Sequence, residues 1–415
     1  MKAEIITIGD EILIGQIIDS NSAHIANELF NIGIEVFQIS SVSDDKEHII
    51  ETIKNAEKCS DLIILTGGLG PTNDDITKSV LTEYFNDTLI ENEDVLLNIK
   101  NIWKKHIKQP LLKVNLDQAL VPSRSIVLMN YMGSAPGIWY EKRSKIFIAL
   151  PGVPTEMKSI LELEVLPKLI STFDLPVAVK KTILTYGLGE SMIAKRINDW
   201  ENGLPKSIKF AYLPSLGRVR LRISSIGINR NEVANKIESE IQKLLPLISD
   251  IFVGFEEDNS IEKIIGSQLV KLNKTLSIAE SCSGGGLAAK FTANPGSSKF
   301  FKGGMVAYDT KSKIRILGVN PNLISEQSVV SLKVAESMAI GVKKIFSSDY
   351  AISTTGNAGP TKGESDTDIG NVCIAIATPE KVFSRQFSFG TGRERVLTKT
   401  INMALTLFQR EIFKN

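Results

Sequence analysis

The sequence predicts an α/β protein: two parallel or mixed-sheet α/β domains joined by a small α+β module. The chain has 415 residues, which at roughly 100–200 residues per domain corresponds to two to four domains. Near both ends, short apolar runs alternate with helix-spaced segments, as in parallel sheets covered by helices. Between them, apolar and charged residues alternate, as in a half-buried strand. We place the domains at residues 1–168, 175–255 and 258–415.

The composition is that of an ordinary globular chain. Lys and Arg number 48 against 47 Asp and Glu, which leaves a net charge of +1. A nucleic-acid-binding domain usually carries a basic excess, so we do not expect nucleic acid as a partner. No apolar run approaches the ~20 residues of a membrane-spanning helix, and the N-terminus lacks a signal-peptide pattern. We therefore expect a cytoplasmic protein without a membrane partner.

Two chemically reactive residue types are scarce. The three cysteines lie far apart with no Cys-x-x-Cys spacing, so neither a disulfide framework nor a thiolate metal site is predicted. The three histidines, His24, His48 and His106, all lie within the first 106 residues of the chain. The last domain therefore cannot build a Ser-His-Asp triad from its own residues.

In the first domain, three apolar runs each end in a polar or glycine-rich loop. The runs span residues 3–8, 61–65 and 145–150, and a helix-spaced stretch at 22–30 follows the first loop. In an open α/β sheet such loops meet outside the carboxyl ends of the strands. We therefore expect them to border one crevice.

Carboxylates would face each other across that crevice. Asp10 and Glu11 follow the first strand, and Asp74 and Asp75 follow the second. Hard oxygen ligands of this kind suit Mg²⁺ or Mn²⁺ bridging a diphosphate. The glycines in residues 66–71 would let backbone amides approach an oxyanion. In the alternative interpretation, Asp74 or Asp75 caps a helix and the glycines only turn the chain.

The middle segment and the third domain continue with shorter elements. In the middle segment we expect strands and helices in the order 180–186 (strand), 190–200 (helix), 219–223 (strand), 232–245 (helix) and 251–254 (strand). In the third domain we expect a helix from Ile261, and strands at 275–279, 304–308, 350–353 and 371–377.

A nucleophile is predicted after the first strand of the third domain. The run Glu-Ser-Cys-Ser-Gly-Gly-Gly places Ser281 at the N-terminus of a helix, where the dipole stabilises negative charge. A lysine crowded by a second cation can take the serine proton, and Lys311 beside Lys313 follows the next strand. The alternatives are a Ser281 N-cap with a solvated basic turn, and Cys282 as a nucleophile or as packing.

Two later loops, residues 353–360 and 390–395, add small hydroxyls, amides and arginine. These groups suit a nucleotide phosphate and a developing oxyanion.

The first-domain motifs resemble a known family. Gly-Asp-Glu-Ile-Leu, Thr-Gly-Gly-Leu-Gly-Pro-Thr-x-Asp-Asp and Leu-Pro-Gly-Val-Pro-x-Glu-Met are similar to the molybdopterin-binding-like domain of the CinA (competence/damage-inducible protein A) family. The resemblance implies a metal-dependent hydrolase that cleaves the diphosphate of ADP-ribose. The metal site would comprise Asp10, Glu11, Asp74 and Asp75, and the substrate would be lined by Gly67, Gly68, Gly70 and Gly152.

The third-domain motifs resemble the C-terminal domain of the same family, a PncC-type nicotinamide mononucleotide deamidase. Glu-Ser-Cys-x-Gly-Gly and Tyr-x-x-Lys-x-Lys carry the resemblance. It implies Ser281 as nucleophile, Lys311 as base, Tyr308 as the partner of that base, and no cofactor. The other implied contacts are Thr355 at the reacting amide, Lys313 and Arg395 at the phosphate, and Gly356 along the substrate.

The middle segment resembles the KH-like module of the same family in position and element order. True KH domains clamp nucleic acid with Gly-x-x-Gly, and Gly187-Leu188-Gly189 is not that clamp. The arginines at 218, 220 and 222 are more simply a solvated strand face than a phosphate track. We interpret the module as a spacer or dimer element and expect a homodimer.

The resemblances together predict a bifunctional nucleotide hydrolase of pyridine-nucleotide salvage. Its substrates would be nicotinamide mononucleotide and ADP-ribose. The alternative is a non-enzymatic pterin-binding or competence-associated DNA-uptake partner, and a fold by itself does not decide between them. Because a guanidinium is not deprotonated in proteins, we expect Lys311→Arg to be nearly as inactive as Lys311→Ala.

Overall fold

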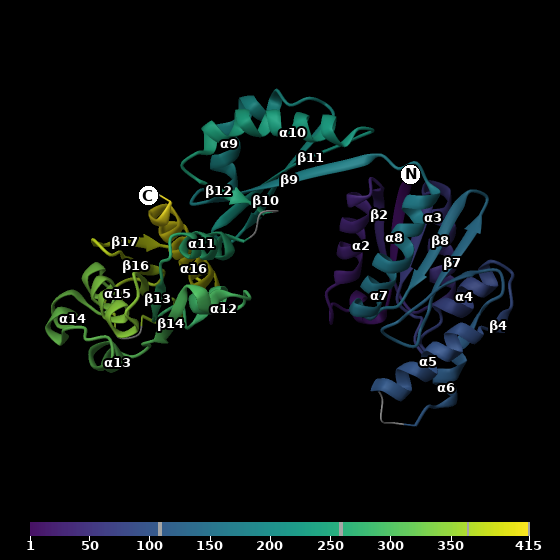
Figure 1. The fold of residues 1–415 in the computed structure, drawn as a ribbon, viewed down its shortest axis with the longest axis horizontal. Helices are drawn as coiled ribbons and strands as arrows, with labels where there is room; N and C mark the ends of the chain where they lie inside the picture. The colour runs from purple at the N-terminus through teal and green to yellow at the C-terminus, as the bar shows by residue number, and fades with distance from the viewer. Residues whose placement is uncertain (107–109, 257–259, 363–364, 414–415) are drawn as a thin grey trace. The chain divides into compact units, whose positions relative to one another are not determined.

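The computed structural model of the chain describes residues 1–106, 110–256, 260–362 and 365–413 (Figure 1). The chain divides into two compact units, one of residues 1–179 with 226–234 and the other of residues 180–225 with 235–415. Within the described residues, no helix is long and apolar enough to cross a membrane.

The first unit is built on a six-stranded mixed sheet, which confirms the predicted fold class. Its strands, in sheet order, are β2 (Glu35–Val42), β1 (Lys2–Ile8), β3 (Leu62–Thr66), β8 (Lys145–Leu150), β7 (Gly137–Lys142) and β6 (Ile126–Leu128). The β2–β1, β1–β3 and β3–β8 pairs are parallel, whereas the β8–β7 and β7–β6 pairs are antiparallel. The loops after β1, β3 and β8 therefore meet at one edge of the sheet.

Helices cover both faces of this sheet because successive strand residues point to opposite sides. Ile5 and Ile64 pack with α2 (Ser20–Asn31), α7 (Pro154–Ile160) and α8 (Leu166–Thr172). Ile6 and Ile63 pack on the other face with α3 (Lys46–Cys59) and α4 (Thr77–Tyr84). The unit also contains α1 (Asp10–Leu13), β4 (Leu89–Glu91), α5 (Glu93–His106), α6 (Lys113–Leu116), the 3-10 helix Asp117–Ala119, β5 (Leu120–Pro122) and the π-helical turn Leu161–Val165.

The middle segment forms a four-stranded sheet with two helices. The strand order is β10 (Ile208–Ser215), β11 (Arg218–Gly227), β9 (Val177–Tyr186) and β12 (Phe252–Phe255), and the helices are α9 (Glu190–Asn202) and α10 (Arg230–Leu244). The predicted α+β character is confirmed.

The last domain contains a five-stranded mixed sheet. In sheet order the strands are β14 (Phe301–Val306), β13 (Leu276–Glu280), β15 (Tyr350–Gly356), β16 (Asn371–Ala377) and β17 (Val382–Ser388). Strand β13 pairs in parallel with both β14 and β15, whereas the β15–β16 and β16–β17 pairs are antiparallel. The helices are α11 (Ile261–Lys271), α12 (Gly286–Thr292), α13 (Thr310–Arg315), α14 (Pro321–Gln327), α15 (Leu332–Phe346) and α16 (Arg393–Ile412).

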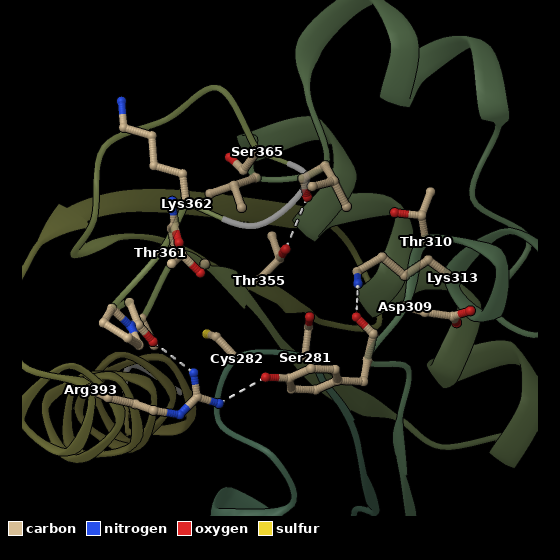
Figure 2. Close-up of a pocket in the computed structure, with 18 residues that line it drawn as sticks. Ser281, Cys282, Asp309, Thr310, Lys313, Thr355, Thr361, Lys362, Ser365 and Arg393 are labelled. Atoms are coloured by element: carbon tan, nitrogen blue, oxygen red, sulfur yellow. Dashed lines mark hydrogen bonds between the residues drawn. The ribbon is translucent and has the colours of Figure 1, made fainter.

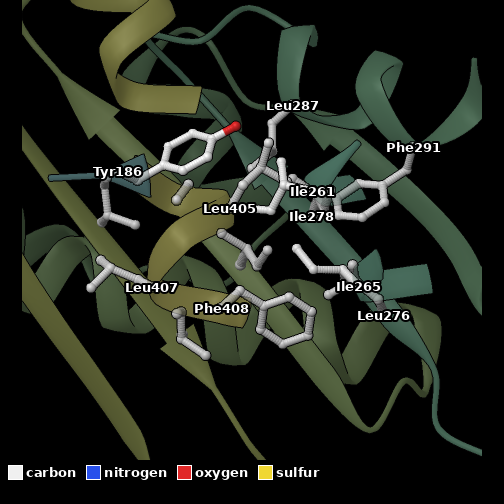
Figure 3. Close-up of a cluster of buried hydrophobic side chains, with 14 of the residues drawn as sticks. Tyr186, Ile261, Ile265, Leu276, Ile278, Leu287, Phe291, Leu405, Leu407 and Phe408 are labelled. Carbon is white, nitrogen blue, oxygen red and sulfur yellow. The ribbon is translucent and has the colours of Figure 1, made fainter. Parts of the chain in front are cut away.

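One face of this sheet forms a core that the middle segment shares. Large residues such as Ile278 pack against α11, α12 and α16. Tyr186 of β9 lies in the same cluster, together with Phe408 of α16 (Figure 3). The middle segment and the last domain are thus joined by a continuous hydrophobic core within the second unit.

The opposite face carries small residues where it meets α15. Ala279, Ala351 and Ala375 point to that face, and they let the helix approach closely. Gly341 on α15 extends this close approach to the turn after α13, because a β-carbon there would lie 2.0 Å from the Leu317 carbonyl oxygen.

This contact predicts an unusual response to a helix-favouring substitution. Gly→Ala inside a helix normally stabilises it by about 1 kcal/mol. Here the new methyl group would collide with backbone, so Gly341→Ala should destabilise the second unit by about 1–3 kcal/mol and lower its calorimetric melting temperature. Ile340→Ala, at the exposed neighbouring position, is the control and should change the melting temperature little. An unchanged or raised melting temperature for Gly341→Ala would contradict the observed packing.

Candidate functional site

A cavity of about 400 Å³ opens at the carboxyl ends of β13, β14 and β15 (Figure 2). The parallel pairing of these strands brings their following loops together. Five of the predicted residues lie in its wall: Ser281, Tyr308, Lys313, Thr355 and Gly356.

Ser281 is held firmly at the floor of this cavity. Its backbone N–H donates to the Thr354 carbonyl at 2.9 Å, so the residue directly after β13 is tied to β15. The side chain is almost fully buried, and Figure 2 shows its hydroxyl pointing into the same space as the Lys313 amino group.

The expected placement of Ser281 at a helix N-terminus is wrong. α12 begins five residues later, at Gly286. Its first amides are already occupied, because the buried Glu280 carboxylate accepts from the N–H groups of Gly285, Leu287 and Ala288 at 3.1, 3.0 and 2.8 Å. Glu280 therefore fixes the turn that carries Ser281, and the dipole of α12 acts on Glu280.

The lysine that enters the cavity is Lys313, whereas the base expected from the sequence was Lys311. Lys311 is exposed and does not line the cavity, whereas Lys313 does and is 2% exposed. The Lys313 amino group donates to the Tyr308 carbonyl oxygen at 3.0 Å. The reason is helical geometry. Asp309 caps α13 by accepting from the Ser312 N–H, and residues two apart on a helix are rotated by about 200° about its axis, so they point to nearly opposite sides.

The cavity arginine is also displaced by two positions. Arg395 is exposed and outside the cavity, whereas Arg393, the first residue of α16, lines it. Arg393 donates to the Gly359 carbonyl oxygen at 3.0 Å and to the Tyr308 hydroxyl at 2.8 Å. The Tyr308 phenol therefore holds Arg393, and the Tyr308 backbone carbonyl holds Lys313.

The remaining wall combines hydroxyl groups, a thiol and a third cation. The Thr355 hydroxyl donates to the Val329 carbonyl at 3.0 Å, which leaves its oxygen free to accept a hydrogen bond. Lys362 pairs with Asp368 at 2.9 Å on the outer side. Burial raises the pKa of the Cys282 thiol to about 12, so it stays protonated at neutral pH and is a poor nucleophile.

A second cavity, of about 700 Å³, lies at the carboxyl ends of β1, β3 and β8 in the first unit. The predicted convergence of three loops is observed. The cavity is lined by seven predicted residues: Glu11, Gly67, Gly68, Gly70, Asp74, Asp75 and Gly152. Asp10 is not among the lining residues, and its backbone N–H donates to Asp44 at 3.0 Å.

Carboxylates that the sequence interpretation missed complete this wall. Asp19, Asp44 and Glu156 line the cavity. Burial, together with the negative charges of Asp10, Glu11 and Asp74, raises the pKa of Asp44. A strand, β2, ends just before Asp44, so recognising that strand would have placed this carboxylate with the others.

The donor set suits a hard divalent cation that keeps part of its water shell. Among the residues the structure describes, no three Asp, Glu, His or Cys side chains lie close enough together to enclose an ion. Mg²⁺ commonly binds through one or two carboxylates and substrate phosphates, and crowded carboxylates favour such a cation. Neither Asp74 nor Asp75 caps α4, although Asp75 accepts from the Thr72 N–H at 2.9 Å.

Three family profiles match the chain in the predicted domain order. A probable molybdopterin-binding domain matches residues 4–171, the KH domain of damage-inducible protein CinA matches 180–252, and the CinA C-terminal domain matches 258–412.

Full-length relatives match as well. A CinA-like protein of Flavobacterium psychrophilum is 52% identical over 100% of this chain and 99% of its own length. A CinA-like protein of Cytophaga hutchinsonii is 40% identical over 99% and 98% of the two chains. Among solved structures, a CinA protein of Thermoplasma acidophilum, described as having unknown function, has 35% identity and a TM-score of 0.37, covering 41% of this chain and 97% of that chain.

The positions of the lysines predict which one would serve the amidase activity expected from the sequence. Lys313→Met should lower any turnover of nicotinamide mononucleotide by about 10²- to 10⁴-fold, because it removes the lysine whose amino group points into the same space as the Ser281 hydroxyl. Lys311→Met, two positions away on the same helix, is the matched control and should stay within a few-fold of wild type. The reverse order in an ammonia-release assay would contradict the geometry.

The raised pKa of Cys282 predicts selective alkylation. Since its thiolate form appears only toward pH 12, iodoacetamide at pH 8 should label the exposed Cys59 and leave the buried Cys282 and Cys373 unmodified. Peptide mass spectrometry checks this directly. Rapid labelling of Cys282 would contradict its burial and its raised pKa.

Proposed function

The chain belongs to the CinA family, and on that premise we propose two hydrolase activities. The last domain is a Ser-Lys amidase that converts nicotinamide mononucleotide to nicotinate mononucleotide. The first domain hydrolyses the diphosphate of ADP-ribose with a divalent cation. The single observation that carries the amidase proposal is that the Ser281 hydroxyl and the buried Lys313 amine share one cavity.

In the proposed amidase reaction, the Ser281 oxygen attacks the carboxamide carbon while its proton passes to the Lys313 amine. Removing an amine from water disfavours its charged form, which is the condition a lysine base requires. The proton then goes to the departing ammonia as the carbon–nitrogen bond breaks. Water, deprotonated by the same amine, hydrolyses the resulting ester. The family resemblance implied Lys311 as the base, and we propose Lys313 in that role instead.

The rest of the cavity supports a nucleotide amide as the substrate. The Thr355 hydroxyl directs its hydrogen bond to the Val329 carbonyl, so its oxygen can accept a hydrogen bond from an N–H of the carboxamide. Arg393 and Lys362 supply positive charge for a phosphate, and Arg393 is orientated by the Tyr308 hydroxyl and the Gly359 carbonyl. The family resemblance implied Arg395 at the phosphate, and we propose Arg393 in that role instead.

In the first domain, the charge of the cavity supports dependence on a metal. The described lining residues include six carboxylates and no Lys, Arg or His: the carboxylates are Glu11, Asp19, Asp44, Asp74, Asp75 and Glu156. A diphosphate would be repelled by this wall unless a cation lay between them. One or two of these carboxylates, together with the substrate phosphates, would hold the cation, and it would neutralise charge on the phosphates.

A non-enzymatic pterin-binding or DNA-uptake role remains the rival proposal, because relatives bear competence-related names and one profile is described as molybdopterin-binding. Ammonia release from nicotinamide mononucleotide and ADP-ribose cleavage by the purified full chain distinguish the two. Absence of both activities would favour the rival.

The two-site proposal predicts independent loss of the two activities. Ser281→Ala should abolish deamidation and leave ADP-ribose hydrolysis intact, and Asp74→Ala should do the reverse. Loss of both activities from either change would show that one shared site had been mistaken for two.

The acidic cavity predicts that chelation removes binding as well as turnover. With EDTA, calorimetric binding of ADP-ribose should fall below detection, because the carboxylates then face the phosphates directly. Deamidation by the same sample should be unaffected, since the Ser-Lys reaction uses no metal. Undiminished ADP-ribose binding in EDTA would contradict the proposed metal requirement.

A further inference from the structure

We propose that Glu156 is the proton-transfer residue of the first-domain cavity, and that it accepts the proton of the water that attacks the diphosphate. This inference rests on the proposed hydrolysis of ADP-ribose. Glu156 is the third residue of α7 and lines the same cavity as Gly67, Asp74 and Gly152. It is therefore within the wall that would surround the phosphates.

A buried amide holds the Glu156 carboxylate in one orientation. The Asn130 side-chain N–H₂ donates to Glu156 Oε2 at 2.7 Å and to the Ala135 carbonyl at 2.8 Å. The Asn130 oxygen accepts from the Met132 N–H at 3.0 Å, and the residue is 1% exposed. Because both ends of the amide are engaged, its N–H₂ must face the carboxylate. Asn130 occupies Oε2, while no hydrogen bond to Oε1 is observed among the described residues.

The backbone around Glu156 is also shaped to admit the carboxylate. A β-carbon at Gly133 would lie 2.3 Å from the Glu156 carboxyl carbon, so this segment passes directly against the carboxylate and a larger residue there would displace it. Ser134 and Ala135, which follow Gly133, line the cavity themselves. The carboxylate therefore sits between this segment and the cavity.

The surroundings of Glu156 differ from those of the cation-facing carboxylates. Residues 130–135 carry no charged side chain. Burial raises the pKa of Glu156 above its ordinary value, opposed only by the Asn130 hydrogen bond. Asp44, by contrast, is perturbed by three neighbouring carboxylates. The other titratable groups of the cavity wall are Glu11, Asp19, Asp74 and Asp75.

These differences divide the work between the carboxylates. The crowded set near Asp44 attracts a cation, whereas an isolated, desolvated carboxylate is a stronger base toward water. In the proposed step the water oxygen forms a bond to one phosphorus, and the bond from that phosphorus to the bridging oxygen breaks. The water proton passes to Glu156 and then to solvent, and the bridging oxygen leaves with the second phosphate. The products are AMP and ribose 5-phosphate.

The decisive variant is Glu156→Gln, which keeps the size of the side chain and an oxygen for Asn130. We expect kcat for ADP-ribose to fall by about 10²- to 10⁴-fold, with Kd and KM within about threefold of wild type. In the wild-type chain, activity should fall at low pH as the base is protonated, at a pH above the ordinary glutamate range because burial raises its pKa. The residual activity of Glu156→Gln should lack this acidic limb.

Two controls keep the test specific. Glu162→Gln changes an exposed glutamate in the turn that follows α7 and should leave the hydrolysis and its pH profile unchanged. Deamidation by the same purified chain reports that each variant is folded. Retention of the rate or of the acidic limb in Glu156→Gln would overturn the assignment, and so would loss of ADP-ribose binding. Absence of hydrolysis in the wild-type chain would instead overturn the first-domain function itself.

Discussion

Parallel pairing of neighbouring strands is the constraint on which both cavities depend. In the last domain, the register of β13 with β14 and β15 brings the turn after Glu280, the turn after Val306 and the end of β15 to one sheet edge. The hydrogen bond from the Ser281 N–H to the Thr354 carbonyl ties the first of these turns directly to β15. In the first domain, the pairing of β1, β3 and β8 does the same for three loops. Each cavity thus assembles from segments that are distant in sequence.

Once the strands have brought the loops together, the helix caps decide which side chains enter a cavity. Asp309 sets the start of α13 and thereby turns Lys313 inward and Lys311 outward. The start of α16 at Arg393, after Gly392, likewise selects Arg393 over Arg395. A motif such as Tyr-x-x-Lys-x-Lys shows that a lysine is present, but a shift of one helical residue changes its direction by about 100°. The sequence therefore predicted the composition of this site better than its individual roles.

The strength of the apolar sequence pattern likewise explains which parts of the fold were predictable. Strands that are buried on both faces, such as β3 and β8, stand out as continuous apolar runs. The edge strands β2 and β17 have mixed and largely exposed residues and were not predicted, which left Asp44 unassigned. Glu280 and Glu156 gain their importance from buried hydrogen bonds to Ala288 and Asn130, and no spacing pattern predicts such contacts.

The proposed amidase reaction requires Ser281 to form the covalent bond to the substrate. Rapid quenching of the full chain with nicotinamide mononucleotide, followed by peptide mass spectrometry, detects such a bond. We expect an adduct with the mass of the nicotinate mononucleotide acyl group on Ser281. An adduct on the adjacent Cys282, or ammonia release with no adduct under conditions in which deacylation is rate-limiting, would contradict it.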